Sequence, residues 1–273
     1  MKFRIMIALI VTLVAVNCKN AGEGSNKKVI PRVTLDHTQI RAEAEGEIYR
    51  DLNHNGKMDI YEDINQTTGA RIEDLLGQMT LDEKAGMLFI NGAAVNDDAT
   101  LEKKEGVKDP AAFMPAAIDH MSVRKMTHFN LWGIPEDPGV LAKWHNNLQR
   151  YAEQTRLGIP VTIASDPRHH FSNQMFSMSA KGFSQFCETL GLAAIGDERV
   201  IKEFAETVRR EYLAVGIRVA LHPQIDLATE PRWPRINGAF GEDAELTARM
   251  VTAYIEGMQG EELNETSVAC MTK

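Results

Sequence analysis

After residue 70, hydrophobic residues occur along the chain in two different patterns. Apolar residues three and four positions apart predict helices over 72–79, 141–151, 197–213 and 243–259. Runs of consecutive apolar residues between them predict buried strands at 86–90, 159–165, 217–227 and 267–272. Buried strands that alternate with helices are typical of parallel strands joined by crossover helices. The pattern therefore predicts an α/β fold.

Local signals mark where some of these elements begin and end. Thr80 and Glu83 have the spacing of a capping box, which predicts a short helix after them. Gly158 and Gly216 stand where two of the longer helices should end. The region 91–132 mixes small, charged and proline-containing stretches, and we expect a long loop there with some helix.

Three polar residues stand at or beyond the carboxyl ends of successive predicted strands: Asp166, Arg235 and Lys273. An open doubly wound sheet and a barrel both fit the alternation of helices and strands. In a barrel, strand ends of this kind converge on one mouth, where ligands bind. We therefore expect a (β/α)8-type, TIM-like barrel over residues 67–273, incomplete within this chain.

The first residues have the pattern of an export signal. Lys2 and Arg4 precede an apolar run over 5–16, which is too short to cross a bilayer but fits a secretory signal peptide over 1–17. Cys18 follows in the position of the lipidated cysteine of a bacterial lipoprotein signal, although ordinary secretion stays open. We expect an exported protein, periplasmic or at the outer membrane or cell surface, that contacts a membrane only through such an anchor.

Residues 18–48 are expected to form a tether, because their first part is polar and contains glycine and serine. Within the next segment, 49–66, oxygen-bearing residues recur at the offsets of an EF-hand calcium loop: Asp51, Asn53, Asn55, Lys57 (through its carbonyl), Asp59 and Glu62. Gly56 stands where such a loop turns with positive φ. A single loop lacks the paired helices of a calcium sensor. We expect a structural Ca2+ site; a solvated polar turn is the alternative.

Composition narrows the range of functions. The 273 residues are 44% hydrophobic and 25% charged, as in an ordinary globular protein. The net charge of −8 argues against a nucleic-acid surface, since phosphate binding needs clustered Lys and Arg. Cys187 and Cys270 are too few for a disulfide framework and are expected to be buried thiols. The eight histidines show no zinc spacing, and we expect the adjacent His169 and His170 to be polar loop residues.

Four sequence segments occur in a characteristic order. They are RIEDLLGQMTLDEKAGML at 71–88, RLGIPVTIASDPRHHF at 156–171, a run over 211–260 that contains PRWPRINGAFGED, and VACMTK at 268–273. Together they resemble the N-terminal domain of glycoside hydrolase family 3. The segment around the expected calcium loop is similar to a leader present on many bacterial members.

The resemblance implies that Asp166, Arg235 and Lys273 bind the terminal non-reducing sugar of a β-glucoside or β-glucan. These residue types suit that ligand, because a carboxylate accepts hydrogen bonds from hydroxyl groups and cationic side chains donate them. Trp233 would shape the mouth or pack beneath its loop. Pro234 departs from the glycine that is usual in the family, and it stiffens the loop before Arg235.

The reaction implied by the resemblance is hydrolysis of a terminal β-D-glucosyl bond with retention, by double displacement between two carboxyl groups about 5–5.5 Å apart. We expect neither the nucleophile nor the acid/base within this chain, which ends at the lysine of the family's Lys-His pair. Asp226, near a strand end, is expected to be structural. No cofactor is implied for catalysis. The alternatives are a β-xylosidase or β-N-acetylhexosaminidase of the same fold, and a non-catalytic, calcium-dependent glycan-binding lipoprotein or inactive fragment.

Overall fold

The structure is a computed structural model that describes residues 41–44, 47–102, 115–171 and 181–273. The expected signal peptide over 1–17 and the expected lipidation site at Cys18 lie outside the described residues. The first described elements, β1 (Arg41–Ala44) and β2 (Glu47–Arg50), pair as antiparallel strands. The boundary expected at residue 48 between tether and calcium loop therefore falls inside β2.

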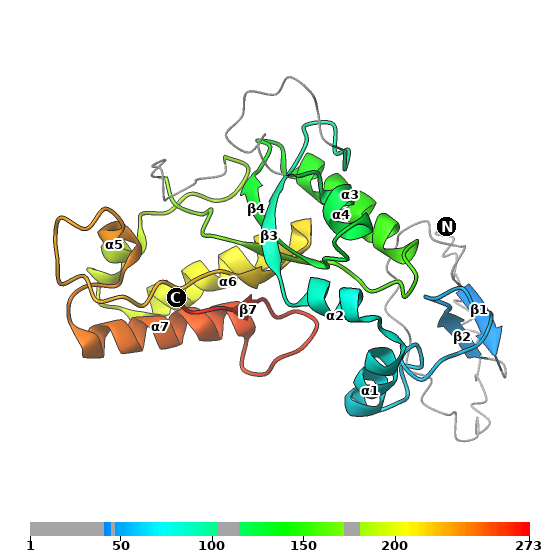
Figure 1. Ribbon diagram of the computed structural model, residues 1–273. Helices are drawn as coiled ribbons and strands as arrows, with labels where there is room; N and C mark the ends of the chain where they lie inside the picture. Colours follow the sequence, from blue (N-terminus) through cyan, green and yellow to red (C-terminus); the bar gives the residue numbers. More distant parts are fainter. Residues whose placement is uncertain (1–40, 45–46, 103–114, 172–180) are drawn as a thin grey trace, which may run out of the picture. The chain divides into compact units, whose positions relative to one another are not determined.

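Five parallel strands form one sheet (Figure 1). They are β3 (Ile90–Ala94), β4 (His128–Gly133), β5 (Thr162–Ser165), β6 (Ile217–Ala220) and β7 (Ala269–Cys270). Their order across the sheet is their order along the chain. A doubly wound sheet reverses that order at a switch point, whereas a barrel keeps it. The parallel strands confirm the predicted α/β class, and their order is that of a barrel.

Helices connect each strand to the next. The connections are α3 (Ala117–Ser122) from β3 to β4, α4 (Pro138–Glu153) from β4 to β5, α5 (Thr189–Ala193) and α6 (Glu198–Val215) from β5 to β6, and the 3-10 helix η3 (Ile236–Gly238) with α7 (Ala244–Gln259) from β6 to β7. The helices predicted over 141–151, 197–213 and 243–259 are confirmed. Their apolar faces pack with the strands into one hydrophobic cluster, whose most buried members include Phe129, Trp144, Ile163, Tyr212 and Tyr254.

An aspartate caps the amino end of each long helix, where its carboxylate accepts a hydrogen bond from a main-chain N–H of the first turn: Asp137, Asp197 and Asp243. Gly216 ends α6 with φ 89°, as predicted from its position. Gly158 does not end α4, which stops at Glu153; it closes the turn that follows. Both cysteines in the described ranges are free and partly buried: Cys187 and Cys270.

The strand predicted at 86–90 is wrong. The capping box forms as expected, with Thr80 Oγ1 accepting from Glu83 N and the Glu83 carboxylate accepting from Thr80 N. The helix that it begins, α2 (Leu81–Met87), runs into the predicted strand, and β3 starts later. Leu88 is 84% exposed. A short apolar run fits a helix end as well as a strand, and here the cap favours the helix.

The region 91–132, expected as a long loop with some helix, contains the helix α3, but it also contains most of β3 and β4, which were not predicted. In β4, Phe129 and Leu131 are buried while their neighbours are less so, which is the period-two pattern of a strand. The helix predicted over 72–79 is present as α1 (Thr68–Gln78), but none of its residues is buried. None of the described helices is both long and apolar enough to cross a bilayer.

Helices α6 and α7 lie side by side (Figure 1). Gly257 in α7 lies at a close contact with α6. A Cβ there would stand 2.6 Å from Ala205 Cβ and 2.7 Å from the Lys202 carbonyl oxygen. We expect Gly257→Ala to lower the free energy of unfolding in urea by about 1–3 kcal/mol, because the helices must separate. In the matched control Gly77→Ala, the added Cβ has no neighbouring atom within 4 Å outside its own stretch of helix backbone. Its free energy of unfolding should rise by about 0.5–1 kcal/mol. Equal effects would contradict this packing.

Candidate functional site

Two of the three polar residues predicted at strand ends meet in the structure. Asp166 directly follows β5, and Lys273 Nζ forms an ion pair with Asp166 Oδ1. The side chains of Lys273 and Asp166 are 32% and 28% exposed, so that a ligand can reach both. Asn130, which lies in β4 and was missed in the sequence, donates from Nδ2 to Asp166 Oδ2 at 3.1 Å. The Asp166 carboxylate therefore joins residues from β4 and from the end of β7.

Arg235 lies in the loop between β6 and α7 and binds a different side chain. Its Nη2 donates to Gln224 Oε1 at 2.8 Å, and Gln224 Nε2 donates to the Arg235 carbonyl at 3.1 Å. The residues on either side of Gln224 bond through their main chain to Lys273. Arg235 is thus brought to the same edge of the sheet, held through Gln224. Trp233 is partly buried and Pro234 is exposed.

A buried arginine lies beneath this edge. Arg168 is 2% exposed; its Nε donates to Ser165 Oγ at 3.0 Å, and its Nη2 donates to the Leu131 carbonyl. Burial lowers the pKa of Arg168, while nearby Tyr212 and Asp166 oppose that shift. The side chain joins the ends of β4 and β5. Sequence reasoning did not find it, because an arginine in a loop normally lies in solvent.

His169 and His170 lie in the loop after β5, as predicted, but they are buried, at 1% and 4% exposed. His169 Nε2 lies 2.8 Å from Glu211 Oε2, and His170 Nδ1 lies 2.8 Å from the Cys187 carbonyl. Burial lowers the pKa of His169 to about 4, although the Glu211 carboxylate opposes the shift. The two rings are therefore neutral core residues at neutral pH.

A third histidine is buried between two tyrosines. His222 follows β6; its Nε2 lies 3.4 Å from the Tyr212 hydroxyl, and its Nδ1 is hydrogen-bonded to the Tyr254 hydroxyl. The Tyr212 hydroxyl also donates to the Asp166 main-chain carbonyl at 2.9 Å. Burial lowers the pKa of His222 well below its usual range, so this ring is also neutral.

The exposed part of this edge can bind a neutral polyhydroxyl ligand. The Asp166 carboxylate accepts hydrogen bonds, the Lys273 ammonium and the Asn130 amide donate them, and charge strengthens the first two. Asp226, two residues after Gln224, is exposed and distinct from the Asp166–Lys273 pair.

A comparison with protein families gives a match over most of the described chain. The profile of the family described as Glycosyl hydrolase family 3 N terminal domain matches residues 80–273. The chain belongs to glycosyl hydrolase family 3. Its parallel sheet is thus part of the family's TIM-barrel-like domain.

Curated β-glucosidases are similar over most of this chain. Beta-glucosidase C of Emericella nidulans is 42% identical over 228 residues, which are 82% of this chain and 35% of that protein. The periplasmic beta-glucosidase/beta-xylosidase of Dickeya chrysanthemi is 45% identical over 231 residues, which are 84% of this chain and 34% of that protein. The chain therefore spans about a third of the length of these relatives.

Solved structures of glycosidases share the fold. A β-glucosidase from Erythrobacter marinus aligns with a TM-score of 0.58 at 23% identity, over 79% of this chain and 26% of that one. A β-N-acetylglucosaminidase from Paenibacillus aligns with a TM-score of 0.53 at 24% identity, over 71% of this chain and 33% of that one. At this identity the likeness concerns the fold alone.

The predicted calcium loop precedes the part of the chain that matches the family 3 profile. Gly56 has φ 74°, as expected for the sharp turn. The Asp51 carboxylate accepts from the main-chain N–H groups of Asn55 at 3.0 Å and Gly56 at 2.9 Å. The Glu62 carboxylate accepts from Asp59 N at 3.0 Å. Both carboxylates are nearly buried, at 9% and 5% exposed. Glu62 Oε1 also accepts from Leu52 N at 2.6 Å, and this bond holds the two ends of the loop together.

The remaining side chains of the loop converge on one carboxylate. Asn53 Nδ2 and Asn55 Nδ2 lie 2.6 and 2.7 Å from Asp59 Oδ2, and Lys57 N donates to Asn55 Oδ1. With a cation bound, a half-turn of each amide would place two more oxygens beside Asp59, and it would break the bonds that Asn55 Oδ1 accepts from Lys57 N and Asn53 Oδ1 accepts from Asn55 N. In the described ranges no three His, Cys, Asp or Glu side chains converge as metal ligands, so that a site here depends on these amide and main-chain oxygens. Burial raises the pKa of Glu62, a shift that a nearby cation would oppose.

The predicted calcium loop contacts the segment that leads into β5. The Leu52 carbonyl lies 2.7 Å from where a Cβ on Gly158 would stand, and Gly158 has φ 58°, so that only glycine fits this approach. The Tyr61 hydroxyl donates to the Leu157 carbonyl at 3.3 Å. The loop therefore contacts the amino end of the strand that carries Asp166 at its carboxyl end.

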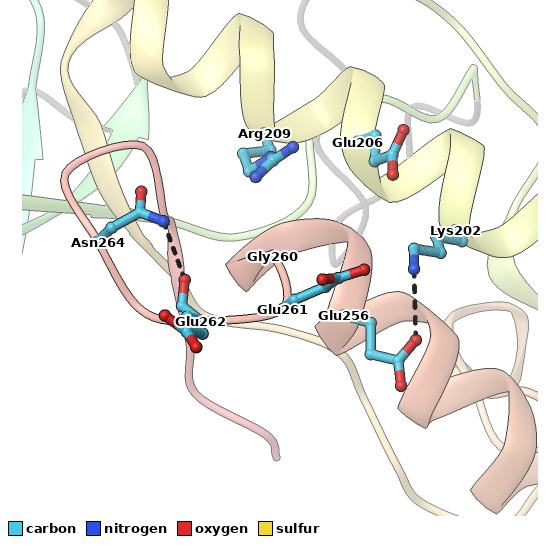
Figure 2. Close-up of a pocket in the computed structure, with 8 residues that line it drawn as sticks. All are labelled: Lys202, Glu206, Arg209, Glu256, Gly260, Glu261, Glu262 and Asn264. Atoms are coloured by element: carbon cyan, nitrogen blue, oxygen red, sulfur yellow. Dashed lines mark hydrogen bonds and ion pairs between the residues drawn. The ribbon is translucent and has the colours of Figure 1, made fainter.

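Figure 2 shows a separate surface hollow of the family 3 domain, between α6 and the end of α7. Its lining is mostly charged, and Lys202 Nζ lies 3.6 Å from Glu256 Oε2 across it. The loop that enters β7 from its amino end forms one wall. The hollow thus lies at the edge of the sheet opposite to Asp166, and we assign it no part in ligand binding.

The pH dependence of stability should follow the buried histidines. Burial lowers the pKa of His169 and of His145 in α4 to about 4 each, whereas an unfolded histidine has a pKa of about 6.5. As the pH falls through this window, the unfolded state binds protons that the folded state does not. The free energy of unfolding in urea should therefore decrease, by up to about 1.4 kcal/mol per pH unit for each histidine.

The variant His145→Gln removes one of these groups outside the site. Its free energy of unfolding should depend less steeply on pH between pH 7 and pH 5. The slope should be smaller by up to about 1.4 kcal/mol per pH unit, which corresponds to one proton. A slope equal to that of the wild type would mean that His145 is protonated in the folded protein as readily as in the unfolded chain.

Proposed function

We propose that the protein to which this chain belongs is an exported β-glucosidase of family 3. It hydrolyses terminal non-reducing β-D-glucosyl residues from glucosides or β-glucans, with retention of configuration. The observation that carries the proposal is the Asp166–Lys273 pair, open to solvent at the carboxyl ends of parallel strands in a family 3 domain. Because the chain spans about a third of its curated relatives, the activity is proposed for the whole protein.

Each residue at this edge has a role in binding the terminal sugar. Asp166 accepts hydrogen bonds from two hydroxyl groups, and Lys273 donates to one of them while it neutralises the carboxylate. Arg235 binds another hydroxyl, and its contact with Gln224 sets the direction of the guanidinium. Asn130 holds the second oxygen of Asp166 in place.

The bond-breaking groups are a nucleophilic carboxylate and an acid/base carboxyl, about 5–5.5 Å apart on the two sides of the scissile bond. Asp166 is assigned to binding the hydroxyl groups of the terminal sugar and to neither of these roles. We assign neither group to this chain. Its part in the reaction is to hold the terminal sugar so that its anomeric carbon faces these groups, which lowers the barrier through positioning.

The names of similar proteins support the substrate class and the place of action. The relative from Dickeya chrysanthemi is named a periplasmic beta-glucosidase/beta-xylosidase. β-Xylosides are therefore included in the substrate test. Export is proposed from that relative together with the signal pattern over 1–17, and membrane attachment from Cys18.

The activity can be tested with the full-length protein encoded by the reading frame of this chain. The wild type should release glucose from a chromogenic β-glucoside. Asp166→Ala should lower kcat/KM by about 100-fold or more, since each lost charge-assisted hydrogen bond costs about 1.5–3 kcal/mol.

The matched control is Glu256→Gln, which removes a carboxylate from a surface ion pair at the other edge of the sheet. This variant should retain the wild-type kcat/KM. No turnover of any β-glucoside, β-xyloside or N-acetyl-β-glucosaminide by the wild type would exclude the proposed function. It would favour a non-catalytic glycan-binding protein.

We also propose that residues 51–62 bind one Ca2+ ion in a structural role. The ligands are Asp51, Asn53, Asn55, the Lys57 carbonyl, Asp59 and Glu62, and the support is the convergence of the two amides on Asp59. The ion would stiffen a loop that is seated against the segment leading into β5. It takes no part in the chemistry.

Calcium should therefore change stability and leave activity unaltered. For a site with Kd of about 10⁻⁴–10⁻³ M, 10 mM Ca2+ should stabilise the protein by about 1.4–2.7 kcal/mol, and each kcal/mol raises Tm by about 2–4 °C. The melting temperature with Ca2+ and with a chelator measures this effect. Glu62→Gln should abolish the response, whereas Asp63→Asn, just outside the loop, should retain it. A wild-type Tm that is indifferent to Ca2+ would leave the loop as a polar turn.

A further inference from the structure

The main-chain carbonyl of Asp166 is held by side chains rather than by the sheet. The β5 ladder ends at Ser165, one residue before this carbonyl. The Asp166 carbonyl accepts from the Tyr212 hydroxyl at 2.9 Å and from Ser165 Oγ at 2.8 Å. Ser165 belongs to the same turn, so Tyr212 in α6 is the contact that ties this carbonyl to another element.

The direction of the Tyr212 hydrogen bond is determined by its partners. A carbonyl oxygen only accepts, so the single Tyr212 hydroxyl proton points at Asp166. The Tyr212 oxygen lies 3.4 Å from His222 Nε2 and must accept a hydrogen bond from it, because its own proton is already used. The ring proton of His222 is therefore on Nε2. His222 Nδ1 then accepts from the Tyr254 hydroxyl.

This chain of hydrogen bonds lies in the core. Tyr212 is 0% exposed, and His222 and Tyr254 are each 1% exposed. Burial lowers the pKa of His222 and raises the pKa of both tyrosine hydroxyls, so that all three groups stay neutral and keep one hydrogen-bond direction. The chain runs from α7 through the end of β6 to α6, all of which are packed elements.

We propose that Tyr212 is a positioning residue, which sets the place of the Asp166 carboxylate by holding the main-chain carbonyl of the same residue. The proposal rests on the function proposed above, in which Asp166 binds the terminal sugar. A carboxylate that accepts from two hydroxyl groups must be placed accurately, and small displacements of a binding group are costly in rate. Tyr212 acts only through Asp166, because its own hydroxyl is buried and already bonded at both ends.

Tyr212→Phe removes the hydroxyl and keeps the ring in the core. In the full-length protein we expect kcat/KM on the best β-glycoside to fall about 10-fold. The matched control is Tyr61→Phe, because the Tyr61 hydroxyl donates to the carbonyl of Leu157, before the other end of β5. Both variants lose one buried tyrosine hydroxyl and should lower Tm to a similar extent, but Tyr61→Phe should retain the wild-type kcat/KM in Ca2+-containing buffer.

A double-mutant cycle separates positioning from a general loss of stability. If Tyr212 acts through Asp166, Tyr212→Phe should change kcat/KM by less than about twofold in an Asp166→Asn background. The same 10-fold loss in that background, or wild-type kcat/KM in the single variant Tyr212→Phe, would overturn the proposal.

Hydrogen–deuterium exchange gives a readout that does not depend on turnover. Peptides covering 163–171 should exchange faster in Tyr212→Phe than in the wild type or in Tyr61→Phe, because the end of β5 opens more readily. Unchanged exchange there would also overturn the proposal. If the wild type is inactive on every β-glycoside, the proposed function fails, while the exchange result still decides whether Tyr212 holds Asp166.

Discussion

The parallel pairing of β4, β5, β6 and β7 is the constraint on which the rest of the structure depends. Parallel strands end at the same edge of a sheet, so residues that follow them converge although they are far apart in sequence. Asn130, Asp166 and Lys273 meet in this way. The pairing continues past the regular strands, since Lys273 N donates to the Pro223 carbonyl at 3.1 Å and Ile225 N donates to the Lys273 carbonyl at 2.6 Å.

The site has an exposed layer of charge above a buried layer of polar groups. Asp166 and Lys273 can exchange their mutual contact for contacts with a ligand, because both are partly exposed. Below them, Arg168 and the neutral His222 are almost completely buried and hydrogen-bonded. Buried polar groups of this kind are costly unless they are satisfied, but when satisfied they hold their neighbours rigidly. Such a rigid layer suits the proposed role of this domain, which is to bind and orient a sugar.

Much of the fold follows from local patterns in the sequence. The long helices α4, α6 and α7 carry apolar residues with a helical period and an aspartate cap, and both signals are short-range. The errors occurred where local signals compete. The apolar run at 86–90 satisfies both a helix end and a strand, and β4 was hidden in a region whose composition indicated a loop. Within the site, Asp166 and Lys273 were predictable because each follows a recognisable strand.

The sequence by itself determined that this is a parallel α/β protein of the family 3 type, since hydrophobic period, capping residues and motif order are all carried by neighbouring residues. The sequence also determined that oxygen-bearing residues recur over 51–62 at the offsets of a calcium loop. Only the tertiary structure decided that Asn130 meets Asp166, that His169 and His170 are buried, and that Tyr212 bonds to the Asp166 carbonyl. The physical reason is that burial and hydrogen-bond partners depend on which elements pack together, and side chains separated by 36 or 46 residues have no local signal of their contact.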